Sequence, residues 1–100
     1  MSFKDDWIAS RRLFILRLLV EVGGAANEGV IYKAITKGGF AHDSRDDLRR
    51  DLDHLKAKGC THEEWLNDSL RVVTVTERGE DAAYGRVEVL GVETSRWDRG

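Results

Sequence analysis

Apolar residues in the first part of the chain recur every three or four positions, which is the spacing of a helix with one buried face. This pattern predicts a first helix from about Asp5 to Val22, closed by Gly23-Gly24. Over residues 13–22, apolar side chains occur on nearly every side of that helix. Such a helix usually has two burial partners. The second partner is expected to be either the C-terminal strands or a second copy of the chain, in a homodimer packed through this helix.

The next apolar stripe predicts a second helix that starts after Asn27 and stops at Gly38-Gly39. Asparagine is a good N-cap residue, and glycine commonly ends helices. Phe40 is expected to fill the core beyond the helix end. The residues expected to face inward are Val30, Ile31, Ala34 and Ile35.

A third helix is predicted to begin after Ser44, because Ser44-Arg45-Asp46-Asp47 has the pattern of a capping box with aspartate in place of glutamate. The helix is expected to run to about Lys58 and to end at Gly59. Its apolar stripe has the spacing of one helical face and consists of Leu48, Leu52 and Leu55. The outward face is expected to hold Asp43, Asp46, Arg50, Asp53 and His54.

Two β-branched or aromatic segments follow, at residues 62–66 and 70–75, and predict a β-hairpin. Between them, Asn67-Asp68-Ser69 is a turn-forming tripeptide, because short polar side chains of this kind hydrogen-bond to their own backbone.

A short helix is expected after the hairpin, with Thr76 as its N-cap and Gly85 as the left-handed residue beyond its end. Residues 87–92 are expected to form a last strand or an extended arm, and residues 93–100 a flexible tail. Three helices, a two-stranded wing and a short helix are the order of a winged helix-turn-helix domain, an α+β fold. We therefore expect a single winged-helix domain over residues 1–92.

Composition narrows the class of protein without changing this picture. A chain of 100 residues with 41% hydrophobic and 34% charged residues is typical of one globular domain. Arg17 and Glu21 interrupt the longest apolar run, so no membrane-spanning segment is expected. The single cysteine, Cys60, cannot form an internal disulfide, and no signal peptide is recognised. These features predict a cytoplasmic protein.

With these elements in place, the chain resembles a small winged-helix protein, often described as ArsR-like, of Mu-like transposable phages and prophages. The resemblance covers most of residues 10–92 and implies a phage or prophage origin, DNA binding and transcription regulation. The motifs that carry it are Arg12-Leu13-Phe14-Ile15-Leu16-Arg17-Leu18-Leu19, Ser44-Arg45-Asp46 with Asp51-Leu52 and Leu55, and Val75-Thr76-Glu77-Arg78-Gly79 with Gly85-Arg86 and Gly91-Val92.

Charge is the main observation that bears on DNA binding. The net charge is −2, but residues 1–60 hold 11 basic and 9 acidic side chains, against 5 and 9 in residues 61–100. The third helix and its flanks carry equal numbers of aspartates and cations. This pattern is typical either of a salt-bridged helix face in solvent or of a helix that reads DNA with its arginines. The candidate DNA contacts are Ser44, Arg45, Arg49, Arg50 and, on the wing, Arg71.

The wing favours a different partner. Its carboxylates are Glu63, Glu64 and Asp68, and Arg71 is its single cation. Wings that follow DNA usually carry several cations. The alternative function is therefore a winged helix that binds another protein, through the acidic residues of the third helix, the wing, or both.

No other chemistry is predicted from the residues. The chain contains no nucleophile elbow, phosphate loop or acid pair at a catalytic spacing, so no enzyme and no cofactor are expected. His54, Cys60 and His62 match no standard zinc spacing, so no metal site is expected either.

Overall fold

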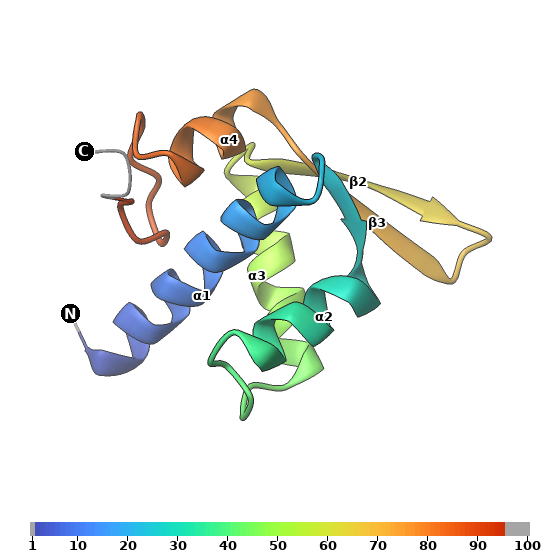
Figure 1. The fold of residues 1–100 in the computed structure, drawn as a ribbon, viewed down its shortest axis with the longest axis horizontal. Coiled ribbons are helices and arrows are strands. Elements are labelled where there is room, and N and C mark those ends of the chain that lie inside the picture. The colour runs from blue at the N-terminus through green and yellow to red at the C-terminus, as the bar shows by residue number, and fades with distance from the viewer. Residues whose placement is uncertain (1, 96–100) are drawn as a thin grey trace.

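The computed structural model describes residues 2–95, which form four helices and a three-stranded antiparallel sheet (Figure 1). This confirms the α+β class, and the order of elements is compatible with a winged-helix fold. The helices and strands, in chain order, are α1 (Phe3–Glu21), β1 (Ala25–Asn27), α2 (Glu28–Lys37), α3 (Arg45–Ala57), β2 (Thr61–Leu66), β3 (Leu70–Val75) and α4 (Glu77–Ala83).

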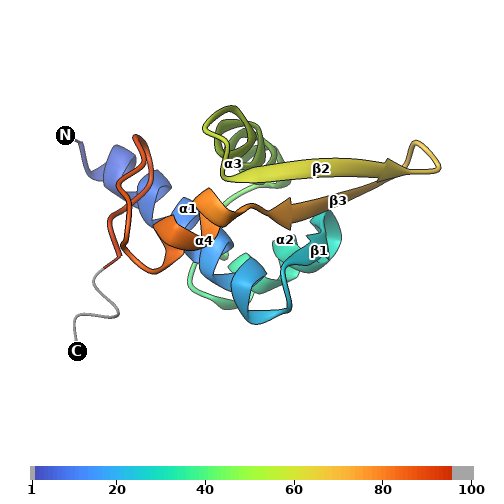
Figure 2. The ribbon, with the colours of Figure 1, turned by 90° about the horizontal axis from the view of Figure 1, so that it is seen from above.

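The sheet has the strand order β1-β3-β2, and β1 is the one strand the sequence did not predict. It is three residues long, with Ala25 opposite Thr74, so it is too short to show an alternating pattern. The predicted hairpin is confirmed. Its turn has positive φ at Asn67 (54°) and Asp68 (59°), and the two strands extend away from the helices (Figure 2).

The predicted caps are confirmed at each of the later helices. The Asn27 side chain accepts from the amide of Val30, and the Thr76 hydroxyl accepts from the amide of Gly79. Gly85, beyond the end of α4, has a φ of +79°. Glycine adopts this left-handed conformation without the steric penalty of a side chain.

The core lies where α1, α2 and α3 meet the inner face of the sheet. Phe40 is buried there as predicted. Val30 was expected to face inward and is instead half exposed. The core direction of α2 is set by Ile31 and Ile35, and Val30 lies roughly 100° or more around the helix from both. The fully buried large side chains of the core are Ile15, Leu16, Leu19, Ile31, Ile35, Leu48, Leu52, Leu55 and Val73.

The second face of α1 is covered by the chain itself. Helix α4 and the segment that follows it pack along α1, where the amide of Glu93 donates to the carbonyl of Ala9 at 3.1 Å. All α1 residues from 11 to 20 are buried or half buried. The C-terminal part of the chain, which was one of the two burial partners expected, therefore covers this face of α1. It does so as a helix and an irregular segment and not as strands. Homodimerisation through α1 stays a prediction.

The expectation of a last strand or an extended arm at residues 87–92 is wrong. Gly91 has a φ of +83°, and the amide of Val92 donates to the carbonyl of Val89, so this stretch turns instead of extending. Of the predicted flexible tail, Ser95 is buried and its hydroxyl contacts Arg17. Residues 96–100 lie outside the described residues.

Candidate functional site

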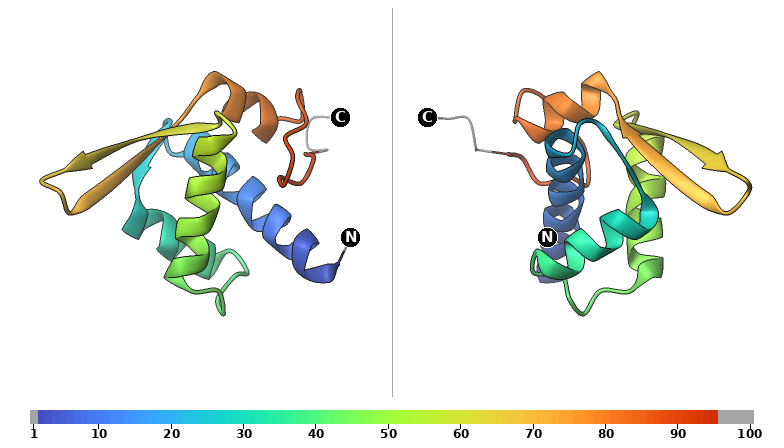
Figure 3. Two further views of the ribbon diagram at one scale, coloured as in Figure 1. Left: turned by 180° about the vertical axis from the view of Figure 1, so that it is seen from behind. Right: turned by 45° about the vertical axis from the view of Figure 1, so that its right-hand side comes forward.

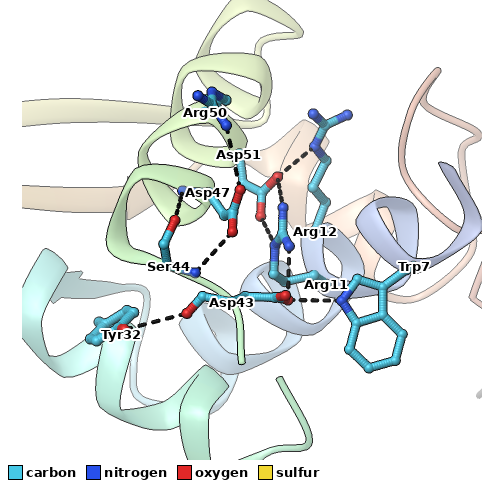
Figure 4. Close-up of polar contacts among 9 residues, drawn as sticks. All are labelled: Trp7, Arg11, Arg12, Tyr32, Asp43, Ser44, Asp47, Arg50 and Asp51. Atoms are coloured by element: carbon cyan, nitrogen blue, oxygen red, sulfur yellow. Dashed lines mark hydrogen bonds and ion pairs between the residues drawn. The ribbon is translucent and has the colours of Figure 1, made fainter. Parts of the chain in front are cut away.

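The candidate site is the outward side of α3, which lies on the outside of the domain beside the hairpin (Figure 3). Its first turn is held by the predicted capping box. The Ser44 hydroxyl accepts from the amide of Asp47 at 3.1 Å, and an Asp47 carboxylate oxygen accepts from the amide of Ser44 at 2.8 Å (Figure 4). The backbone hydrogen bond from Ser44 lowers the pKa of Asp47. Because the Ser44 hydroxyl acts as acceptor here, its proton stays available to a ligand.

Two other aspartates of this region point into the domain. Asp51 is 0% exposed and accepts from Arg11 and, at 2.9 Å, from Arg12. Asp43 accepts from Arg11 and from the indole of Trp7, both at 2.8 Å (Figure 4). Burial by itself lowers the pKa of Arg11, but the hydrogen bonds to Asp51 and Asp43 outweigh this effect and raise it. The expectation that Asp43 faces outward is therefore wrong, because it precedes the helix and turns towards α1.

Glu28, in the first turn of α2, holds two arginines of α3 in position. Its carboxylate lies 3.5 Å from Nε of Arg45 and 3.2 Å from Nε of Arg49. Arg45 also lies over the ring of Tyr32, with 5.2 Å from Cζ to the ring centre. Both arginine side chains are about half exposed, whereas Glu28 is buried. One buried carboxylate therefore orients two guanidinium groups without hiding them from solvent.

Arg71 does not lie at an exposed wing position. Its side chain is 8% exposed and points towards the helices, because β3 alternates and places Arg71 on the same face as the core residue Val73. Its Nη2 donates to Glu63 at 2.6 Å and to Asp53 at 2.8 Å. Burial by itself lowers the pKa of Arg71, but these hydrogen bonds raise it overall. Arg71 connects the hairpin to α3 and is not presented to a ligand.

The exposed stripe of α3 consists of Asp46, Arg49, Arg50 and Asp53, which have the i, i+3, i+4, i+7 spacing of one helical face. Arg50 is the more exposed of the two arginines of this stripe, at 76% of its side chain, against 51% for Arg49. Nη1 of Arg50 lies 3.4 Å from Asp47, and Nη1 of Arg49 lies 3.5 Å from Asp46. Exposed pairs of this kind contribute about 0–1 kcal/mol. The arginines can therefore exchange these partners for a ligand at little cost.

The end of the hairpin has a different character. Trp65, Leu66 and Leu70 are exposed there, next to the exposed carboxylates of Glu64 and Asp68. The ring of Trp65 lies 5.9 Å from the guanidinium carbon of Arg71. This end of the molecule is apolar and acidic.

The described residues hold no cluster of metal ligands and no membrane-spanning helix, and their one cysteine is buried. No group of three or more potential metal ligands occurs within them. None of the helices described in residues 2–95 is long and apolar enough to cross a membrane. Cys60 is fully buried, and burial raises the pKa of its thiol.

The structure thus defines an α+β domain, compatible with a winged-helix fold, whose third helix presents a stripe of arginines and aspartates. The chain is 38% identical over 93 residues to the uncharacterized protein gp26 of Escherichia phage Mu, covering 92% of this chain and 94% of that protein. It is 39% identical over 79 residues to an uncharacterized protein of Haemophilus influenzae, covering 78% and 76%. The chain therefore belongs to the family of the phage Mu protein gp26. No protein-family model matches it, and neither does any solved structure.

Proposed function

We propose that this protein is a winged-helix DNA-binding protein of a Mu-like phage or prophage that regulates transcription. In this proposal α3 lies in the major groove, as the second helix of a helix-turn-helix does. The observation that carries the proposal is the division of charge around α3, where three of the five aspartates are held by arginines of α1 or by the capping box while the arginines of α3 stay exposed.

The sequence around α3 has equal numbers of aspartates and cations, but this division leaves unequal numbers of them exposed. Asp43 and Asp51 are paired with arginines of α1, and Asp47 is part of the capping box. Two aspartates of this region, Asp46 and Asp53, remain on the exposed stripe. The exposed cations of α3 outnumber them and are Arg45, Arg49, Arg50 and Lys56. Among the exposed side chains of α3, cations therefore outnumber carboxylates, which favours a polyanion as its ligand. The less exposed carboxylates of Glu28, Asp47 and Glu63 lie within 4.0 Å of these cations.

Each residue has a role that follows from its position. Arg50 and Arg49, on the middle of the exposed stripe, would reach base edges. Arg45 and Ser44, at the N-terminal end of α3, would bind phosphate, where the helix dipole also favours an anion. Arg71 has no direct role, because it is buried.

Homodimerisation belongs to the same proposal, because two copies of α3 would read two half-sites. With residues 11–20 of α1 covered, the contact would use the first turns of the helix, where Phe3 and Trp7 are exposed. Sedimentation velocity of the wild type and of Phe3→Ser tests this part. A wild-type chain that remains monomeric at high concentration contradicts it.

The test of DNA binding is fluorescence anisotropy of labelled duplexes at two salt concentrations. Binding is expected at low salt and should weaken steeply as salt is raised, because bound cations release counterions from DNA. Arg45→Ala combined with Arg49→Ala should abolish binding while circular dichroism shows a folded domain. Arg86→Ala is the matched control, since Arg86 is an exposed arginine paired with Asp81 beyond the end of α4. Binding that survives in the double variant contradicts the residues chosen.

A second candidate function, a protein-interaction module, is favoured by one observation. The hairpin end exposes Trp65, Leu66 and Leu70 beside carboxylates, which suits a basic, partly apolar protein better than DNA. This candidate predicts no DNA binding at low salt. It also predicts a protein partner whose affinity is lost with Trp65→Ala and kept with Arg50→Ala.

A further inference from the structure

We infer that α3 reads G·C base pairs, because its exposed stripe offers the side chains that recognise guanine and cytosine and none that recognise adenine. The inference rests on the proposed DNA binding and adds the class of sequence bound.

The first part of the argument is the chemistry of the stripe. In the major groove, arginine donates two hydrogen bonds to N7 and O6 of guanine, and aspartate accepts from the exocyclic amine of cytosine. Adenine is read by asparagine or glutamine. The exposed stripe holds Asp46, Arg49, Arg50 and Asp53. No asparagine, glutamine or threonine occurs between Ser44 and Lys58.

The second part is the support that these side chains receive. Nε of Arg49 lies 3.2 Å from the buried carboxylate of Glu28, which orients its guanidinium. Asp53 accepts from Arg71 at 2.8 Å and is still 72% exposed. A guanidinium or carboxylate held by a neighbour loses less freedom on binding, and this favours specific contacts over mobile ones.

The third part concerns the minor groove, where A·T-rich sequences are recognised by arginines inserted into a narrow groove. The hairpin is the element of the described chain that would reach this groove. Its one cation, Arg71, is 8% exposed and paired with Glu63. Its exposed end carries Glu64 and Asp68. The hairpin therefore supplies no cation to favour A·T-rich sites.

The experiment compares two pools of labelled duplexes with equal length and identical flanks. The central block is randomised with G and C alone in one pool and with A and T alone in the other. Anisotropy is measured at one salt concentration, so the phosphate contribution is the same for both. We expect the G/C pool to bind at least roughly fivefold more tightly, the discrimination of one arginine–guanine contact.

The variant Arg50→Gln replaces a guanine-reading side chain with an adenine-reading one at an exposed position. The G/C preference should fall by roughly fivefold or more in Arg50→Gln and stay unchanged in the control Arg86→Gln. Equal binding of the two pools, or a preference for the A/T pool, overturns the inference and leaves DNA binding intact. A G/C preference that Arg50→Gln does not change overturns the assignment to the stripe. Absence of binding to both pools at low salt overturns the proposed function itself.

Discussion

The substitution Asp51→Asn tests the division of aspartates on which the proposed function depends. Asp51 and Asp46 lie on the same helix, five positions apart. Asp51 is 0% exposed and accepts from Arg11 and Arg12, whereas the side chain of Asp46 is 76% exposed and lies 3.5 Å from Arg49. The same chemical change at the two positions should therefore have very different effects on stability.

The size of the effect follows from the contacts. Removing one partner of a buried ion pair costs about 3–5 kcal/mol, because the other charge is left without compensation. Asparagine keeps one acceptor oxygen, and Arg11 keeps Asp43, so the lower end of about 3 kcal/mol is expected. This is a large part of the roughly 5–15 kcal/mol that stabilises a domain of this size. Asp46→Asn, by contrast, should change the free energy of unfolding by about 0.5 kcal/mol or less.

The assay is urea unfolding followed by circular dichroism. With a dependence on urea of about 1.5 kcal/mol per molar, Asp51→Asn should lower the unfolding midpoint by about 2 M, while Asp46→Asn leaves it nearly unchanged. If the two variants unfold at the same midpoint as the wild type, Asp51 is not a buried partner of Arg11. The argument that the exposed cations of α3 outnumber its exposed carboxylates would then fail.

Four further predictions concern single positions. Ser44→Ala should lower the free energy of unfolding by about 1 kcal/mol in a thermal or urea melt, and no change would contradict the capping box. The pKa of Asp47 is lowered in the folded state. Its contribution to stability is therefore present above the unfolded pKa of about 4 and is lost as pH falls through the folded pKa. An NMR titration midpoint above about 4 for the Asp47 carboxyl would refute this prediction. Gly79→Ala should destabilise the domain by about 1–3 kcal/mol, because a Cβ there would overlap the backbone carbonyl of Cys60; an unchanged melting temperature would contradict that packing. The thiol of Cys60 should react with a thiol reagent at pH 8 in urea but not in the native protein, since burial raises its pKa, and fast native reaction would contradict its burial.

Local patterns account for most of the fold. The caps at Asn27, Ser44 and Thr76 are recognisable because they depend on residues three positions away. The strand β1 was missed because its pairing with β3 joins residues that are far apart in the sequence. The segment 87–92 has the composition of a strand. It is irregular because Gly91 has a positive φ and its carbonyl accepts from Arg12 of α1.

The candidate site was predictable in part. The spacing of α3 places Arg50 on its outward face, as the structure shows. Arg49 was not among the residues expected on that face and is also exposed. The role of Glu28 has no sequence signal, because an acidic residue in the first turn of a helix is common for reasons of the helix dipole alone. Arg71 was misjudged for a related reason. A cation on a strand is normally exposed, and the carboxylates of Glu63 and Asp53 that allow its burial come from other elements.

An NMR titration of the isotope-labelled protein with a G·C-rich duplex tests the central claim most directly, because it reports both binding and the surface that is used. The account predicts salt-sensitive shifts in the amides of α3, largest around Arg49 and Arg50, with shifts near Glu28 and little change at Trp65. No shifts at low salt, or shifts confined to the end of the hairpin, would contradict a DNA-reading role for α3.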